Sequence, residues 1–217
     1  SRATDLDQLV RWQARKTTPF RIEEAQVACT EGAEAGGGGR EFVVSLMRRD
    51  IVQEYESVCS AAGGHAGIID LASFSQINAI LAGDTDTAGD WLLVHVAHGY
   101  STLAVIRNGA LILFRSRSSE GDETLADLVH QTTMYYEDRL QGSGFQRAFL
   151  AASAANTTKE DAAVLRQSLE VRLGTAVEPL TLPRGGLDSE GEPQLPDLIA
   201  APLGLLLREQ VGSGARR

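Results

Sequence analysis

The histidines of this sequence are the first side chains to consider as metal ligands. His95 and His98 lie three residues apart in an apolar segment. On a strand, residues three apart face opposite sides of the sheet, so these two imidazoles cannot readily share a metal ion. His130 has Asp127 one helical turn before it, but two ligands do not complete a site that needs three or four. The sequence therefore predicts no metal site.

Two other patterns resemble catalytic or ion-binding motifs without completing them. Ser153 lies in an Ala-Ala-Ser-Ala-Ala run, which lacks the glycines of a nucleophile elbow. Asp84, Asp86 and Asp90 lack the glycine and glutamate spacing of an EF-hand, so a solvated acidic loop is the better interpretation. The consecutive glycines at 36–39 lie between two predicted strands, which favours a hairpin loop over a phosphate-binding loop.

The composition is that of a folded protein without a basic surface. The chain has 217 residues and a net charge of −9, and no stretch concentrates Lys or Arg, which argues against nucleic acid as a partner. Cys29 and Cys59 lack CxxC spacing and are expected to be free thiols in a reducing cytoplasm. The longest apolar run, Leu198 to Leu207, is about half of what a bilayer requires. Any membrane association is therefore expected to come through a partner.

The first part of the chain is predicted to form a small domain over residues 1–64. Pro19 ends a first helix, and Gly63 and Gly64 stop a second one that carries apolar residues on one face. The expected elements are a helix over 6–14, strands over 26–29 and 41–47 joined by a loop over 31–39, and a helix over 49–62 with Ile51, Val52, Tyr55 and Val58 on its apolar face.

The second part, residues 65–217, alternates strands and helices, which predicts an α/β fold with helices on the faces of a sheet. Asn108 and Gly109 between apolar runs predict a tight hairpin. Thr157 and Glu160 have the spacing of a capping box. The expected strands are 66–71, 91–97, 101–106, 110–115, 145–151 and 177–182, and the expected helices are 73–81, 122–140, 157–173 and 195–208 with a kink at Pro202.

Several segments together resemble the PilM-like proteins of type IV pilus machines, which belong to the actin-like ATPase superfamily. The segment Leu9 to Trp12, followed by Thr18 to Glu24, resembles the small inserted subdomain of that family. Further similar segments, in family order, are Arg48 to Asp50, Ile69 to Phe74, Leu92 to Leu103, Met134 to Leu140 and Ala201 to Arg208. The resemblance implies an actin-like (ribonuclease H-like) fold, truncated, with an inserted helix-strand-strand-helix subdomain at the N-terminus.

The departures from the family pattern concern the nucleotide. Members begin with a hairpin that carries the first phosphate loop, and this chain is expected to lack it. The second phosphate loop carries Asp-x-Gly, whose carboxylate holds hydrated magnesium; the matching positions here are His95 and Ala97, although Gly99, Ser101 and Thr102 remain. The adenosine loop is rich in glycine, whereas this chain has Ala151, Ala152 and Ser153. The resemblance therefore implies a pseudo-ATPase without a cofactor, or a remnant phosphate contact at the surviving hydroxyls.

The resemblance also implies a function. In the family, a groove beside the inserted subdomain binds the N-terminal cytoplasmic peptide of an inner-membrane protein, PilN. We therefore expect a cytoplasmic scaffold, peripheral to the inner membrane through a PilN-like partner. Trp12, Pro19, Phe20 and Ile22 are candidates to contact that peptide or, alternatively, core residues. Two other hypotheses remain: an ATP-binding actin-like protein, and a module of a type II secretion L-type or cell-division actin-like protein.

Overall fold

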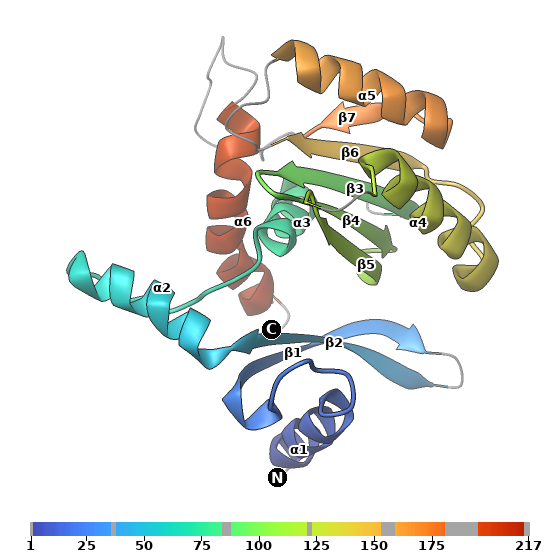
Figure 1. Cartoon of the computed structure of the whole chain (residues 1–217). Coiled ribbons are helices and arrows are strands. Elements are labelled where there is room, and N and C mark those ends of the chain that lie inside the picture. Colours follow the sequence, from blue (N-terminus) through green and yellow to red (C-terminus); the bar gives the residue numbers. More distant parts are fainter. Residues whose placement is uncertain are drawn as a thin grey trace. The chain divides into compact units, whose positions relative to one another are not determined.

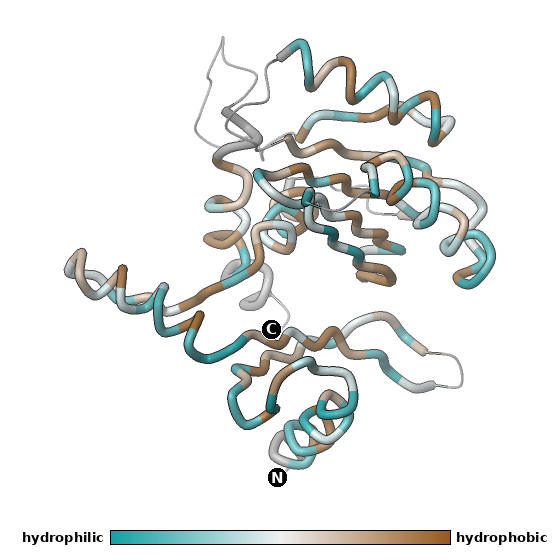
Figure 2. Tube along the Cα trace, viewed as in Figure 1, coloured by the Kyte–Doolittle hydropathy of each residue, from teal (hydrophilic) through white to brown (hydrophobic). Residues whose placement is uncertain are grey.

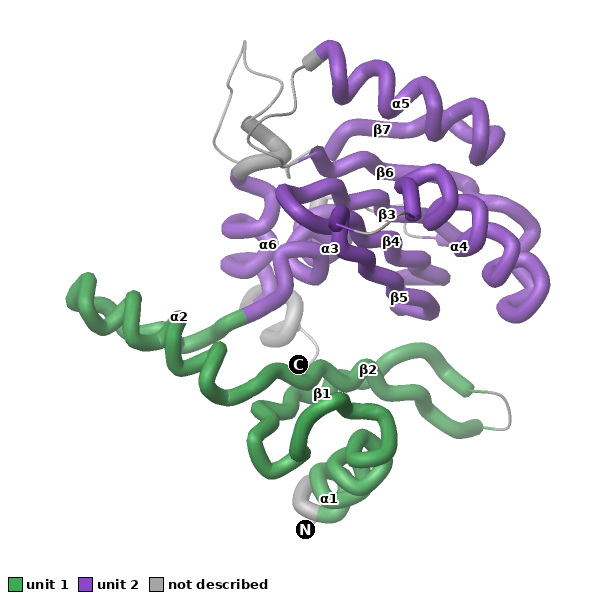
Figure 3. The backbone as a smooth tube through the Cα atoms, viewed as in Figure 1, with its two compact units in different colours: residues 1–69 green, residues 70–217 purple. Residues whose placement is uncertain are grey.

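The computed structural model describes residues 2–35, 38–83, 88–120, 123–152, 159–180 and 195–214 (Figure 1). Apolar residues are concentrated along the central strands, as Figure 2 shows by hydropathy. No helix in these described ranges is long and apolar enough to cross a membrane. Figure 3 shows the division of the chain into two units, Ser1–Ile69 and Asp70–Arg217.

The N-terminal unit contains the helix, two strands and helix expected from the sequence. Its elements are α1 (Arg2–Ala14), the 3-10 helix η1 (Ile22–Glu24), β1 (Ala25–Ala35), β2 (Gly39–Arg48) and α2 (Arg49–Ala61). A small core of Ala14, Ile22 and Ala25 joins α1 to the β1–β2 ribbon. This unit is therefore held together by few buried side chains, as expected for a domain of this size.

The β1–β2 hairpin is longer than the sequence indicated. The expected loop over 31–39 is wrong in extent, because β1 continues to Ala35 and β2 begins at Gly39. The register shifts between Glu31 and Glu34, which marks a β-bulge. An ion pair between Arg40 and Glu31 links the two strands across this irregular part. The pairing of β1 with β2 thus continues through small residues that were predicted to form a loop.

The segment from 66 to 71 was predicted to be a strand and has no regular structure. A strand needs a neighbour to satisfy its backbone groups, and no strand in the described part of the chain pairs with this segment. Its end is instead fixed by Asp70, which accepts a hydrogen bond from the Leu71 backbone N–H at 2.8 Å and pairs with Arg208 at 3.0 Å. An apolar run alone therefore did not identify its structure.

The C-terminal unit is a sheet of strands in the order β5-β4-β3-β6-β7. Its elements are α3 (Ala72–Gly83), β3 (Asp90–Ala97), β4 (Tyr100–Arg107), β5 (Ala110–Ser118), α4 (Leu125–Leu140), β6 (Arg147–Ala152), α5 (Lys159–Leu173), β7 (Val177–Pro179) and α6 (Leu195–Gly214). β3, β4 and β5 are antiparallel neighbours, whereas β6 runs parallel to β3 and β7 parallel to β6. The predicted α/β fold is confirmed.

Local sequence signals explain several boundaries in this unit. Asn108 and Gly109 both have positive φ, 50° and 78°, which is the backbone of a two-residue hairpin turn. Thr124 and Asp127 form a capping box that starts α4. Thr157, predicted to cap α5, lies outside the described residues, and α6 continues through Pro202 to Gly214.

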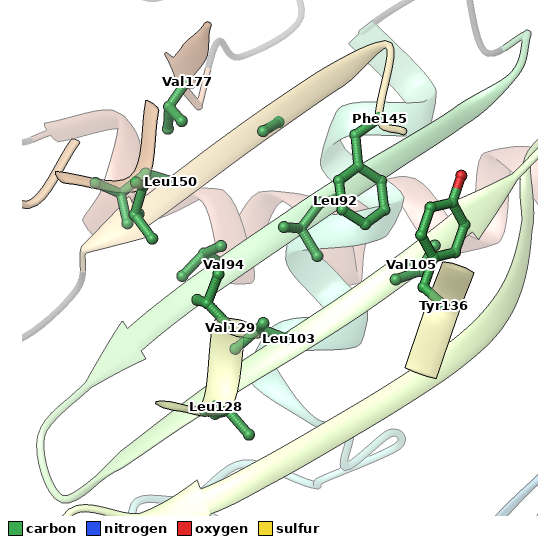
Figure 4. Close-up of a cluster of buried hydrophobic side chains, with 12 residues drawn as sticks. Leu92, Val94, Leu103, Val105, Leu128, Val129, Tyr136, Phe145, Leu150 and Val177 are labelled. Carbon is green, nitrogen blue, oxygen red and sulfur yellow. The ribbon is translucent and has the colours of Figure 1, made fainter. Parts of the chain in front are cut away.

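Helices cover both faces of the sheet (Figure 1). On one face, alternate side chains of β3, β4 and β6 pack against α4 and α5; Figure 4 shows Leu92, Val94, Leu103, Val105 and Leu150 of the strands meeting Leu128, Val129 and Tyr136 of α4. On the other face, Trp91, Leu93, Ile106 and Phe149 pack against Ile77 and Ile80 of α3 and Ala200 of α6. The sheet is therefore buried on both sides, as α/β sheets require.

α3 and α6 pack backbone to backbone at Gly204. A Cβ atom placed on Gly204 would lie 1.7 Å from the carbonyl oxygen of Ser75 and 3.1 Å from the backbone nitrogen of Ala79. Such distances are far inside van der Waals contact, so only glycine allows the two helices to approach this closely. The close approach accounts for a glycine at this position, although glycine is a poor residue for a helix interior.

We expect Gly204→Ala to lower the free energy of unfolding by about 2 kcal/mol, because the added methyl group must push α6 away from α3. In an open helix the same change would raise it by about 1 kcal/mol, so the sign of the effect is diagnostic. Urea unfolding followed by the fluorescence of the buried Trp91, in a Trp12→Phe background, measures it.

The matched control for this prediction is Gly67→Ala, because nothing lies within 4 Å of a Cβ atom at Gly67. That variant should stay within about 0.5 kcal/mol of its parent. A Gly204→Ala protein as stable as its parent would contradict the close packing of the two helices.

Candidate functional site

The carboxyl ends of β3 and β6 meet at one edge of the sheet. In the parallel register, His95 lies opposite Ala151 and Val96 opposite Ala152. The segments predicted to be remnants of the phosphate and adenosine loops therefore begin on neighbouring strands. In open α/β sheets, ligands bind outside the carboxyl ends of the strands, so this edge is the candidate site.

His95 is buried in the core rather than presented to solvent. Its side chain is 1% exposed and lies on the α3 side of the sheet, where Nδ1 is 2.8 Å from the hydroxyl oxygen of Ser73. The ring also meets Tyr100 edge to face, with centroids 5.6 Å apart. Burial lowers the pKa of His95 to about 4, so the imidazole is neutral at pH 7. It is an uncharged link between β3 and α3.

The other residues predicted to be remnants of the phosphate loop differ in how far they are exposed and in whether their hydroxyl groups are already hydrogen-bonded. Thr102 is buried opposite His95 in the β3–β4 register and donates a hydrogen bond to Ser116 at 3.1 Å. Ala97 and Ser101 are half-buried at the end of the hairpin. Gly99 is exposed, with φ 86°, and has nothing within 4 Å of the position that a Cβ atom would take. Gly99 therefore leaves open space beside its backbone at the turn.

The alanines at the end of β6 point in two directions. Ala151 is fully buried among the residues that pack against α3 and α6. Its methyl group therefore contacts the core. Ala152 is half-buried, and Ser153 lies outside the described residues.

Two polar residues of α3 were missed in the sequence. Ser73 is the partner of His95, and Gln76 is 1% exposed with its Oε1 atom making no hydrogen bond within the described part of the chain. Buried polar atoms normally have partners, so an unpaired amide oxygen is unusual. The spacing Ser73, Gln76, Ile77 and Ile80 places all four on one helical face, which is a signal that could have identified them.

His95 is not a ready magnesium ligand in this structure. Magnesium prefers hard oxygen donors, whereas His95, which the sequence resemblance matches to a carboxylate of the family, is a neutral imidazole that faces the core. The hydroxyl of Thr102 already donates a hydrogen bond to Ser116 on the neighbouring strand. No group of three or more His, Cys, Asp or Glu side chains that could hold a metal occurs among the described residues.

At the opposite edge of the sheet, Asp90 is the centre of a polar network. Arg107 donates to it through Nε and Nη2 at 2.7–3.0 Å, and the Tyr136 hydroxyl donates to it at 2.6 Å. Burial works against ionisation of Asp90, but these hydrogen bonds lower its pKa overall. Burial and the Asp90 carboxylate raise the pKa of Tyr136 to about 12. The network borders an open hollow of about 580 Å³ and fastens β3, β4 and α4 together.

The four candidates for partner contact divide into surface and core. Trp12 is 57% exposed on α1, with the Lys16 ammonium 4.2 Å from its ring centroid, and Pro19 is exposed in the turn that follows. Ile22 is 8% exposed and belongs to the small core, against which Phe20 packs while half-buried. Trp12 and Pro19 thus offer apolar surface, and Phe20 and Ile22 support the turn between them and β1.

Comparisons with known proteins give the fold. No family model and no curated protein matches the chain. Among solved structures, a "PilM-PilN type IV pilus biogenesis complex" is similar over 95% of this chain and 72% of that chain, with a TM-score of 0.72 and 18% identity. A protein of unknown function with an actin-like ATPase fold, from Bacteroides thetaiotaomicron, covers 88% of this chain and 65% of its own, with a TM-score of 0.48 and 10% identity. The likeness to the PilM-PilN complex shows that the chain has the fold of PilM, the actin-like fold that the sequence resemblance implied.

The buried state of His95 predicts a pH dependence of stability. In the unfolded chain His95 has its ordinary pKa of 6.5, whereas burial lowers the pKa to about 4 in the folded chain. The contribution of the neutral imidazole is therefore fully present above pH 6.5 and is lost as the pH falls toward 4. In total it amounts to about 3 kcal/mol at 1.36 kcal/mol for each pKa unit.

The measurement is urea unfolding of the wild type and of His95→Asn at several pH values between 7 and 4. Asparagine offers Ser73 an uncharged partner and cannot take up a proton, so the variant should lose less stability over this range. Because both proteins keep the same carboxylates, parallel losses in the two would refute a buried neutral His95.

Proposed function

We propose that this chain is a non-catalytic cytoplasmic scaffold of a type IV pilus or a related secretion machine. The observation that carries the proposal is the likeness to PilM over 95% of the chain. PilM is found there in a complex with PilN, and the N-terminal unit of this chain has the helix-strand-strand-helix arrangement that the resemblance assigns to the inserted subdomain. On this proposal the chain reaches the inner membrane through its partner.

The partner we propose is the N-terminal cytoplasmic peptide of a PilN-like protein, with Trp12 and Pro19 as the first contacts. Large exposed aromatic side chains are common anchors of binding surfaces. The surface that carries them is fixed, because the Thr18 hydroxyl donates to the Ala14 carbonyl at 2.6 Å and Phe20 packs against the small core. A fixed surface loses little entropy when a peptide binds to it.

The same proposal assigns no nucleotide hydrolysis to the chain. The support is chemical: a neutral, buried imidazole occupies the position where the family has a magnesium-binding carboxylate. The Thr102 hydroxyl, which could otherwise contact a phosphate, bonds to Ser116. Residue 95 thus contributes to the core of the unit, and we infer that binding, rather than catalysis, is what the fold retains.

We expect the N-terminal peptide of the PilN-like partner to bind saturably in a calorimetric titration. Replacing Trp12 with alanine should raise the dissociation constant by about 10- to 30-fold, since it removes a large apolar anchor. Gln13→Ala is the control, because Gln13 is exposed next to Trp12 on α1 without offering an apolar surface. The proposal fails if the wild type shows no saturable binding.

We expect ATP with magnesium, at millimolar concentration, to leave the melting temperature unchanged. Any ligand that binds only the native state must raise it, so thermal unfolding is a direct test. The PilN-like peptide serves as the positive control in the same assay. A saturable rise with the nucleotide would favour the alternative of an ATP-binding actin-like protein.

A further inference from the structure

The helix α2 has an apolar face that its own unit leaves uncovered. None of its residues is buried, although it carries Ile51, Val52, Tyr55 and Val58 on one side. Tyr55 is 60% exposed and Val58 70% exposed. Figure 2 shows apolar and polar residues alternating along this helix. Exposed apolar surface arranged in one stripe marks an interaction site more often than scattered apolar residues do.

The spacing of the stripe suits another helix. Ile51, Tyr55, Val58 and Ala62 follow one another at intervals of four, three and four residues, with Val52 and Cys59 half-buried along one border. This is the 3-4 spacing by which the side chains of two helices interdigitate. An extended peptide would present side chains every second residue and could not match a stripe of this period.

The charges beside the stripe indicate the sign of the partner. By helical geometry, at 100° per residue, Glu54 lies on one border of the stripe, and Glu56 lies on its other side, beyond Val52 and Cys59. A helix with Lys or Arg on both of its borders would therefore be attracted to these two glutamates. A second copy of α2 would bring glutamates toward glutamates, and an anionic membrane surface would be repelled.

We propose that the apolar face of α2 docks an amphipathic helix of a partner protein whose apolar stripe is bordered by basic residues. The proposal goes beyond the scaffold function above and does not depend on it, because it concerns α2 and not the surface around Trp12. It adds a second attachment point to the N-terminal unit.

The test uses the full chain and a synthetic amphipathic helix with leucines in the stripe and lysines on both borders. We expect binding in a calorimetric titration, and no binding of a peptide of the same composition in scrambled order. Val58→Asp should weaken the binding at least about tenfold, because it places a charge in the apolar contact. Ser57→Asp adds the same charge on the opposite face of α2, where Ser57 is exposed, and should retain binding. Loss of binding in both variants would overturn the proposal.

A charge exchange tests the partner's sign. The double variant Glu54→Lys and Glu56→Lys should bind a peptide with glutamates on its borders more tightly than the lysine peptide, which reverses the preference of the wild type. An unchanged preference would overturn the proposal.

Three further results would each overturn it by identifying another occupant. A lower melting temperature for Val58→Asp than for Ser57→Asp would show that the chain covers this face itself. A dimer of the wild type that Val58→Asp converts to a monomer, in sedimentation, would assign the face to a second copy. Co-sedimentation of the wild type with vesicles containing phosphatidylserine, lost in Val58→Asp, would assign it to a membrane.

Discussion

The burial of β3 on all sides is the constraint on which the C-terminal unit depends. β4 and β6 pair with its two edges, and helices cover both of its faces, so that Trp91 through His95 are all buried. A charged group at any of these positions would need a partner, because an isolated charge in such surroundings costs far more than a folded protein can tolerate. His95 satisfies the constraint as a neutral ring that shares a hydrogen bond with Ser73. At the start of β3, the ionised carboxylate of Asp90 has the partners it needs, because Arg107 and Tyr136 donate hydrogen bonds to it.

This constraint connects the fold to the function that we propose. The sequence resemblance implies that actin-like ATPases have a carboxylate facing the nucleotide at the position of His95, where water, metal and phosphate would surround it. In this chain the ring of His95 instead contacts Ser73 and Tyr100. The residue therefore stabilises the packing of α3 on the sheet. A protein with this arrangement gains order at the edge without a ligand, which suits a scaffold whose binding surfaces lie elsewhere.

The sequence was sufficient for features that depend on neighbouring residues and insufficient for those that depend on distant ones. The turn at Asn108 and Gly109, the helix α4 and the alternation of strands and helices all follow from local backbone preferences and from the periodicity of apolar residues. The contact of Ser73 with His95 and that of Tyr136 with Asp90 join residues 22 and 46 positions apart, and no local pattern encodes them. Ala151 illustrates the same limit for the candidate site. The sequence shows an alanine at this position, but whether its methyl group faces a ligand or the core depends on which face of the sheet α3 and α6 cover.

The close contact of α3 with α6 has a consequence for how the C-terminal unit is assembled. α3 is the first element of this unit and α6 the last, and Asp70 and Arg208 pair beside them. The face of the sheet against which Ile77 and Ile80 pack is therefore completed only by α6, which is made after the strands and helices that it joins. During synthesis this face stays partly uncovered until α6 has been made, whereas the face that packs against α4 can be covered earlier. Contacts so distant in sequence slow folding, and a nascent chain halted before Gly204 would leave uncovered the backbone of α3 around Ser75 and Ala79, which that glycine contacts.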